Sequence, residues 1–287
     1  MQVASASLAP VTLSSKLSRP APARLVAVGD LHGDLEATRR VLRLAGAIDA
    51  KDKWIGGAMT VVQTGDEIDR GDDDKEILDL VERLKREAKA AGGEFIALCG
   101  NHELMNVAQD FRYVTPHGFE EFAAKDPGKV LAEGPRGGRA AAFKPGSEIA
   151  RELAERPIVV RVGDTVFVHG GLLPRHLAYG LDKLNDEVDA WLVGASPSMP
   201  AAASAEDSPV WSRVYSTSPT PADCAQLQAT LTALGAKRLV MGHTVQEKGI
   251  NSVCEGAAWR IDVGMSKHYG GAPAALEIRG DAVKVLQ

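Results

Sequence analysis

The chain has 287 residues, of which 45% are apolar and 25% charged, and its formal net charge is -5 at pH 7. This length suffices for one large domain or two small ones, and the composition is typical of a soluble globular protein. The acidic balance argues against a general nucleic-acid-binding protein, but it leaves room for a locally basic pocket that binds a phosphorylated partner. No apolar run approaches the roughly 20 residues that span a bilayer.

Residues 1–23 differ in composition from the rest of the chain. They contain five serines and no acidic residue, and the first carboxylate of the sequence is Asp30. Two interpretations remain open for this stretch: a disordered tail, or a transit segment for a plastid or mitochondrion. Without a transit function we expect a cytoplasmic protein, and in either case a folded domain over residues 24–287.

The cysteines are few and widely spaced. Cys99, Cys224 and Cys254 lack the spacing of a metal knuckle, and an odd, sparse set is a poor disulfide framework. We therefore expect no disulfide and a reducing environment.

Strands alternate with helices in the first third of the chain. A buried strand over 24–28 precedes a helix over 34–44, and a second strand over 59–63 leads to three consecutive aspartates, residues 72–74. These aspartates are interpreted as the acidic N-terminus of an amphipathic helix rather than as a metal site. Further strands are predicted at 95–98, 158–162, 165–168, 238–241, 259–263, 276–278 and 283–286.

Two stretches lack a clear period. Residues 106–146 are rich in glycine, proline and charge, so we expect a small inserted cap there. Residues 195–208 are rich in Ala, Ser and Pro and are expected to form a flexible loop.

Five predicted strands end in polar, glycine-containing turns. These are GDLHGD at 29–34, GDEIDRG at 65–71, GNHE at 100–103, HGG at 169–171 and GHT at 242–244. Ligands of open α/β sheets bind at the carboxyl ends of strands, so we expect these side chains to meet in one region. Carboxylate, imidazole and amide oxygen suit divalent Mn, Fe or Zn, and one carboxylate that bridges two such ions gives a clamp for phosphoryl transfer.

In this order the five motifs resemble those of the calcineurin-like metallophosphoesterases. The intact DRG at 69–71 and GNHE indicate the phosphoprotein phosphatase superfamily, and with WSR at 211–213 the chain is most similar to the Shewanella-like protein phosphatases. The resemblance runs from about residue 24 to the C-terminus. It implies an α/β fold in which two mixed β-sheets form a central sandwich flanked by helices, with a small cap insertion at about 106–146.

The resemblance also implies a dinuclear metal site. A first metal ion would be held by Asp30, His32 and Asp66, and a second by Asp66, Asn101, His169 and His243. We expect two divalent ions, with Mn favoured in vitro and Fe or Zn as alternatives.

The remaining roles follow from the same likeness. His102 matches a general acid, Asp69 the carboxylate that orients it, and Arg70 a phosphate-binding residue; Asn101 and Arg213 are further candidates for binding phosphate. The implied reaction is in-line attack on a phosphate ester by hydroxide held between the two metal ions. Regulatory subunits are left open, because residues 265–271 stand where the large eukaryotic phosphatases of this superfamily carry a different C-terminal segment.

Three functions are weighed. The first is a Ser/Thr protein phosphatase, with phosphotyrosine left open; basic groove walls, for which Arg136, Arg139 and Lys144 are candidates, would favour it. The second is a dinucleoside tetraphosphatase or other small-molecule phosphohydrolase, which an aromatic cage for a base would favour. Candidates for that cage are Phe111, Tyr113 and Phe119. The third is a non-catalytic phospho-binding scaffold, which the full set of expected metal ligands argues against.

Two residues near the motifs are given structural interpretations. Glu103 is expected to be an acid at a helix start, and Tyr269 a packed or surface tyrosine rather than a substrate contact.

Overall fold

The computed structural model of the chain describes residues 8–123 and 134–287. Its strands form two mixed sheets. In the first, five strands follow the order β11 (Ala282–Leu286), β10 (Ala275–Arg279), β2 (Leu25–Val28), β3 (Thr60–Gln63) and β4 (Glu94–Ala97). In the second, six strands follow the order β1 (Ser18–Arg19), β5 (Val159–Val162), β6 (Thr165–Val168), β7 (Arg238–Met241), β9 (Ala258–Arg260) and β8 (Asn251–Val253).

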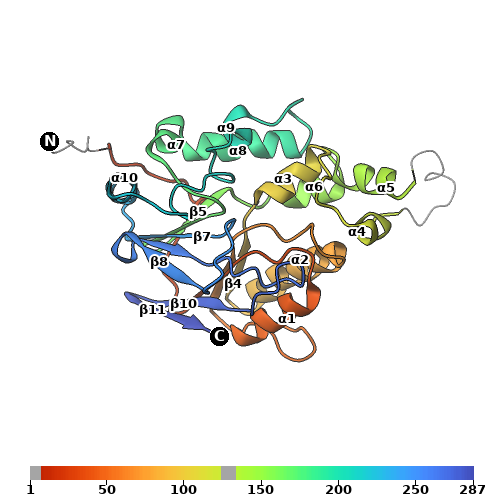
Figure 1. Cartoon of the computed structure of the whole chain (residues 1–287), viewed down its shortest axis with the longest axis horizontal. Coiled ribbons are helices and arrows are strands. Elements are labelled where there is room, and N and C mark those ends of the chain that lie inside the picture. The colour runs from red at the N-terminus through yellow and green to blue at the C-terminus, as the bar shows by residue number, and fades with distance from the viewer. Residues whose placement is uncertain (1–7, 124–133) are drawn as a thin grey trace.

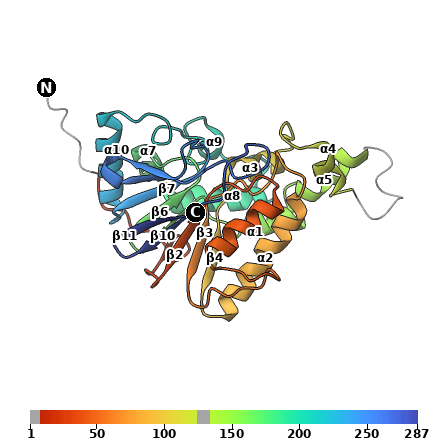
Figure 2. The ribbon, with the colours of Figure 1, turned by 60° about the horizontal axis from the view of Figure 1, so that its bottom comes forward.

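The two sheets face each other across an apolar layer. Leu25 and Ala27 of β2 pack there against Val160 of β5 and Phe167 of β6. Because side chains alternate along a strand, Val26 and Val28 point to the opposite face of the sheet. That face is covered by α1 (Leu35–Leu44) and α2 (Asp74–Ala90), as Figure 2 shows. The predicted sandwich of two mixed sheets is therefore confirmed.

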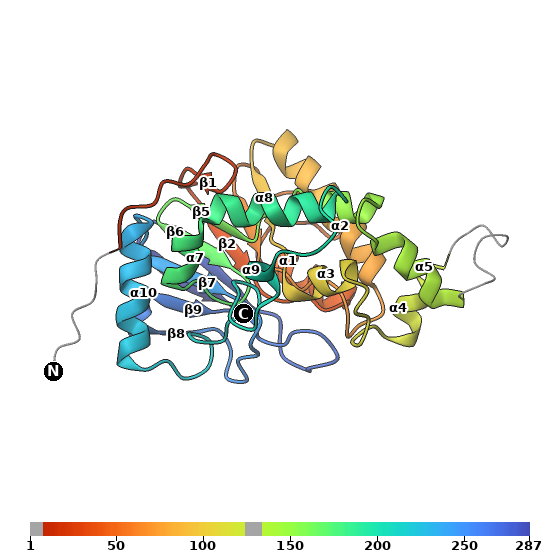
Figure 3. The same cartoon turned by 90° about the horizontal axis from the view of Figure 1, so that it is seen from above.

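Other helices cover the outer face of the six-stranded sheet (Figure 3). They are α7 (Pro174–Tyr179), α8 (Leu181–Leu192), α9 (Ala201–Ser204) and α10 (Pro221–Ala233). Leu184 and Val188 of α8 share a core with Val166 of β6 and Leu239 of β7. None of the helices in the described ranges combines the length and apolar character needed to cross a lipid bilayer.

The segment expected as a cap contains two helices at one end of the molecule. These are α4 (Pro116–Glu120) and α5 (Gly134–Phe143), which lie at the end opposite α10 in Figure 1. They connect to the sheets through α3 (Asn101–Val107) and α6 (Glu148–Leu153). The part of the predicted cap between residues 124 and 133 lies outside the described residues.

Residues 8–23 are part of the fold. Ser18 and Arg19 form β1, which pairs in parallel with β5, and the side chain of Leu17 is fully buried. The expectation of a disordered tail is therefore wrong for residues 8–23, because Leu13 and Leu17 find a place in the core of the six-stranded sheet. Residues 1–7 of the predicted tail lie outside the described residues.

The expectation of no disulfide is also wrong. Cys224 in the first turn of α10 is bonded to Cys254, which follows β8, while Cys99 is a buried free thiol. The fold brings these two elements together although their cysteines are 30 residues apart in the chain.

Candidate metal centre and its proton-donor pair

The polar turns that follow five strands meet at one edge of the sandwich. Strands β2, β3 and β4 are parallel to one another, as are β6 and β7, so within each group the carboxyl ends point the same way. Their turns bring together the predicted residues, and all of them are buried: Asp30, His32, Asp66, Asp69, Asn101, His102, His169 and His243.

The carboxylate of Asp66 lies at the centre of this group. Its Oδ2 is 3.1 Å from Nε2 of His169, 3.8 Å from Nε2 of His102 and 3.9 Å from Nε2 of His32. The ligand atoms of Asp66, His169 and His243 all lie within 4.8 Å of one another, and so do those of Asp66, His32 and His102. One carboxylate therefore belongs to two groups of residues that could each hold a metal ion.

Three of the histidines are oriented by backbone carbonyls. Nδ1 of His32 lies 3.2 Å from the carbonyl of Ile68, and Nδ1 of His169 lies 2.9 Å from that of Thr64. Nε2 of His243 lies 3.2 Å from the carbonyl of Trp211. A carbonyl accepts only from a protonated nitrogen, so the other nitrogen of each ring carries a lone pair that points into the cluster.

The inward-facing atoms fit a cation. Nε2 of His169 is 3.2 Å from Nδ1 of His243 and 2.9 Å from Oδ1 of Asn101. In the neutral rings these atoms present lone pairs to one another, and lone pairs at such distances repel unless a proton or a metal ion lies between them. Burial alone would lower the pKa of His169, but the nearby carboxylate of Asp66 raises it instead. Oxygen and nitrogen donors without a thiolate are the ligands of Mn, Fe or Zn.

Neighbouring charges also favour a cation at this site. The carboxylate of Asp30 accepts the backbone N–H of His243 and lies 3.9 Å from His32, and its pKa is raised by burial and by Asp262 and Asp66. Burial also lowers the pKa of His32 to about 3 and that of His243 to about 2, so both rings are neutral. Several buried carboxylates beside neutral imidazoles are destabilising without a positive ion.

His102 differs from the other three histidines because a carboxylate holds it. Its Nδ1 lies 2.7 Å from Oδ2 of Asp69, while Nε2 points towards Asp66. Burial by itself would lower the pKa of His102, but Asp66 and Asp69 outweigh burial and raise it. An imidazole with a raised pKa and one free N–H has the character of a proton donor.

Several of these residues adopt strained backbone conformations. The φ values lie in the left-handed region that non-glycine residues rarely occupy: 47° at His32, 58° at Asp66, 69° at Asp69, 71° at Arg70 and 67° at His243.

Buried hydrogen bonds to Glu103 support one of these turns. Its carboxylate accepts the backbone N–H groups of Asp66, Glu67 and Gly100. Glu103 lies in the first turn of α3, so its interpretation as a helix-start acid is confirmed.

Two arginines border the cluster. The guanidinium carbon of Arg70 lies 4.0 Å from the centre of the Tyr113 ring and 5.9 Å from that of Tyr269, and Nε of Arg70 is buried without a hydrogen-bond partner among the described residues. Arg213 is exposed and donates to the carbonyl of His243 at 3.0 Å and to Oγ1 of Thr244 at 2.7 Å.

Other candidate residues do not lie where the sequence predicts a groove wall or an aromatic cage. Arg139, considered as a groove wall, is fully buried, because its guanidinium pairs with Asp69 and Asp74. Phe111 packs edge-on against Phe119 at 5.9 Å, while Tyr113 lies over Arg70, so these three aromatic residues form no common cage.

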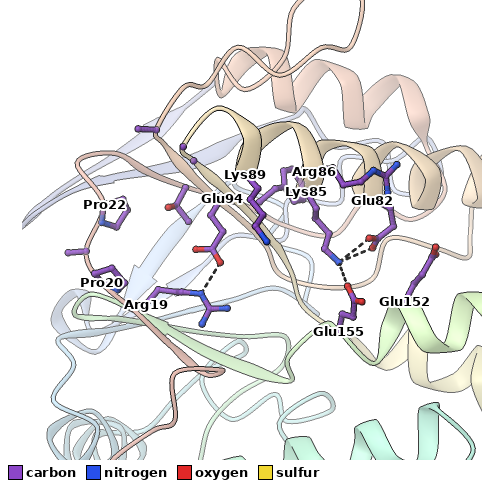
Figure 4. Close-up of a pocket in the computed structure, with 16 residues that line it drawn as sticks. Arg19, Pro20, Pro22, Glu82, Lys85, Arg86, Lys89, Glu94, Glu152 and Glu155 are labelled. Atoms are coloured by element: carbon purple, nitrogen blue, oxygen red, sulfur yellow. Dashed lines mark hydrogen bonds and ion pairs between the residues drawn. The ribbon is translucent and has the colours of Figure 1, made fainter.

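A cavity of about 790 Å³ lies away from the cluster, between residues 19–22, the second half of α2 and the start of β4. Figure 4 shows its walls, where Arg19 pairs with Glu94, and Lys85 with Glu82 and Glu155. It shares no residue with the cluster.

The sequence did not identify the residues that contact Asp69 and Asp30 and hold them in place. Asn106 donates to both oxygens of Asp69, and Asp74 accepts the backbone N–H of Asp69 at 2.9 Å. Asp262 is buried beside Asp30. Asp262 follows the observed strand β9, but the predicted strand over 259–263 includes it, so the turn signal was missed; Asn106 and Asp74 belong to helices.

The calcineurin-like phosphoesterase family model matches residues 23–247. The chain belongs to this family. It is 44% identical to Shewanella-like protein phosphatase 2 of Arabidopsis thaliana, over 91% of this chain and 76% of that protein. It is 30% identical to Shewanella-like protein phosphatase 1 of Plasmodium berghei, over 92% of this chain and 74% of that protein.

Solved structures of this calcineurin-like fold agree with the architecture. A cold-active protein-tyrosine phosphatase of a psychrophilic Shewanella species has a TM-score of 0.77 and 24% identity, with 96% of this chain and 86% of that chain covered. A yeast protein serine/threonine phosphatase has a TM-score of 0.61 and 16% identity, with 94% of this chain and 83% of that chain covered.

This calcineurin-like phosphoesterase is therefore a phosphatase, similar to the Shewanella-like protein phosphatases, and its family uses divalent metal ions.

Proposed function

We propose that this phosphatase is a phosphomonoesterase that removes phosphate from serine and threonine residues of proteins and uses two divalent metal ions. The observation that carries the proposal is that the Asp66 carboxylate lies close to both His32 and His169, which belong to two different groups of candidate ligands. A carboxylate in this position could be shared by two divalent ions, which would serve phosphoryl transfer. The names of the relatives, which include protein phosphatases from a plant and a parasite, support a phosphoprotein substrate.

Each ion has its own set of residues in this proposal. Asp30, His32 and Asp66 would hold the first ion, and Asp66, Asn101, His169 and His243 the second. When bound, such ions lower the pKa of water and screen the negative charge of a phosphate ester. The donor set fits Mn, which we expect in vitro, and equally Fe or Zn.

His102 is proposed as the residue that protonates the leaving oxygen. Asp69 holds Nδ1, so the proton on Nε2 is the one that can move to the oxygen of the departing alcohol. Serine and threonine leave as alkoxides, which are poor leaving groups. A proton donor that is held in place by a carboxylate therefore suits this substrate class.

The two arginines and Asn101 are proposed to bind the phosphoryl oxygens. Within residues 8–123 and 134–287, Nε of Arg70 is buried without a hydrogen-bond partner, which an anionic oxygen would satisfy. Arg213 is held beside His243 by two hydrogen bonds of its Nη1, and its other N–H groups are proposed to bind phosphate.

A second candidate substrate is phosphotyrosine. Tyr113 and Tyr269 flank Arg70 at the edge of the cluster, and Tyr269 is 39% exposed. Two such rings could stack on the ring of a phosphotyrosine. The Shewanella phosphatase with the same fold is named as a protein-tyrosine phosphatase.

The test is steady-state hydrolysis by Mn-loaded protein of p-nitrophenyl phosphate, phosphoserine and phosphothreonine peptides, a phosphotyrosine peptide and diadenosine tetraphosphate. Asp66→Asn should abolish turnover of every substrate, and His102→Asn that of the phosphoserine and phosphothreonine peptides, while His117→Asn, an exposed histidine outside the cluster, should not. Turnover of the serine and threonine peptides supports the proposal. Preference for the tyrosine peptide selects the second candidate, and turnover confined to the dinucleotide overturns both. A protein that binds metal but hydrolyses none of them is a scaffold.

A further inference from the structure

Arg139 connects the cap to the pair formed by Asp69 and His102. It lies on α5, 70 residues from Asp69 in the chain, and its side chain is fully buried. Nη2 lies 3.1 Å from Oδ1 of Asp69 and 2.8 Å from Oδ2 of Asp74. A buried arginine that pairs with two carboxylates holds both of them in place, because none of the three charges is stable there alone.

The guanidinium acts on Asp69 by two routes. The direct route is the ion pair with its carboxylate, which leaves Oδ2 of Asp69 for Nδ1 of His102. The indirect route runs through Asp74, whose Oδ1 accepts the backbone N–H of Asp69 and supports its strained φ of 69°. Arg139 therefore fixes both the backbone and the carboxylate of Asp69.

The cap fixes the orientation of the guanidinium itself. Its carbon lies 5.0 Å from the centre of the Phe122 ring and 4.9 Å from that of Phe143, so the group packs against both aromatic side chains, which also contact each other. Nε donates to Oδ1 of Asn106 and Nη1 donates to the carbonyl of Gly118, both at 2.8 Å. Asn106 in turn donates to Asp69, which closes a network of buried hydrogen bonds around that carboxylate.

We propose that Arg139 is a positioning residue for the proton donor: it holds Asp69 so that Asp69 can hold His102 facing the leaving oxygen. This inference rests on the proposed role of His102. It means that the cap helps to position the proton donor. It also replaces the expectation from the sequence that Arg139 lines a substrate groove.

The variant Arg139→Met tests this role with two substrates that differ in their leaving groups. Phenyl phosphate needs a proton donor more than p-nitrophenyl phosphate does, because phenolate is the poorer leaving group. We expect kcat for phenyl phosphate to fall about tenfold or more and kcat for p-nitrophenyl phosphate less than about threefold, with KM within about twofold of wild type. Mn²⁺ binding, measured by isothermal titration of the metal-free protein, should stay as in wild type.

Two further variants separate positioning from general stability. Arg156→Met removes another buried arginine, which pairs with Glu67 and Glu82 rather than with Asp69, and any loss of kcat should be equal for both esters. Arg139→Lys keeps the charge but not the planar fork, so it should fold even where the methionine variant does not, and it should show a smaller loss with the same preference for the better leaving group.

Equal losses for the two esters, unchanged kinetics, or a fall in Mn²⁺ affinity that matches the fall in kcat would overturn the inference while leaving the proposed function intact. A wild-type protein that hydrolyses neither ester would instead overturn the proposed function and this inference with it.

Discussion

Nδ1 of His102 lies 2.7 Å from Oδ2 of Asp69, and both side chains are buried. The two residues come from different turns, one after β3 and one at the start of α3. The carboxylate therefore fixes the direction in which the opposite nitrogen of the imidazole points, and that direction is towards Asp66.

Asp69→Asn keeps the shape of this pair but removes its charge. We expect kcat for a phosphoserine peptide to fall by about 10²-fold or more, with KM changed little, because the imidazole loses the negative charge that stabilises its protonated form. Steady-state kinetics of the Mn-loaded protein measure this. Asp79→Asn, at an exposed position on α2, is the matched control and should behave as wild type. Equal kinetics for the two variants would exclude a role for Asp69.

Mn²⁺ should stabilise the wild-type protein, because an ion that binds only the folded chain raises its free energy of unfolding. At an ion concentration 100 times Kd the gain is about 2.7 kcal/mol for one site. Thermal melts with and without a chelator measure this shift. Asp66→Asn should lose most of it because it lacks the carboxylate shared by both groups of ligands. A variant that still gains the full shift would argue against Asp66 as a ligand.

Leu17→Ala tests whether the first residues of the described chain carry part of the core. Leu17 is fully buried, so we expect the free energy of unfolding to fall by about 2–5 kcal/mol. Leu44→Ala is the control: Leu44 is 37% exposed, and its replacement should change stability by about 0.5 kcal/mol or less. Chemical denaturation gives both values. Similar small losses in the two variants would mean that the N-terminal segment contributes little.

Cys224→Ser removes the disulfide between α10 and the turn after β8. Closing a loop of this length restricts the unfolded chain, so its loss should lower stability by about 2–4 kcal/mol. A reductant should destabilise the wild-type protein by a similar amount and leave the variant unchanged. Denaturation curves with and without reductant test this, and a wild-type protein insensitive to reductant would contradict it.

Stability should also depend on pH through the pair Glu76 and Glu121. Burial and the nearby Glu76 raise the pKa of Glu121 to about 9 from its ordinary 4.5, and Glu121 accepts the backbone N–H groups of Asp74 and Lys75. The folded protein holds this proton more tightly than the unfolded chain. The stabilisation is therefore fully present below pH 4.5 and is lost as the pH rises through about 9.

In the variant Glu76→Gln the side-chain amide donates an N–H to Glu121. The contact between the two side chains then no longer needs the carboxyl proton of Glu121. We expect the variant to melt about 2 °C higher than wild type at pH 9 and at the same temperature at pH 5. Glu120→Gln, exposed on the same cap segment, should follow the wild-type curve. Parallel curves for Glu76→Gln and wild type would show that the shared proton does not affect stability.

Much of the centre was readable from local sequence. Each polar turn follows an apolar strand, and parallel strands bring their carboxyl ends to one edge, so Asp30 could be expected to lie near Asp66, and His169 near His243. The strand predicted over 165–168 has the observed bounds, because Thr165–Val168 is a run of β-branched and aromatic residues between turn residues. These features depend on residues that lie close together in the chain.

Other features depend on contacts between residues far apart in the chain. Nδ1 of His169 bonds to the carbonyl of Thr64, 105 residues away, and Arg139 reaches Asp69 across 70 residues. The burial of Leu17 and the pairing of Cys224 with Cys254 likewise arise only when the six-stranded sheet is complete. The sequence by itself determined which groups are available for chemistry, because motif and strand are adjacent in the chain. Only the tertiary structure decided what orients those groups, because an ion pair or carbonyl contact leaves no periodic pattern in the sequence.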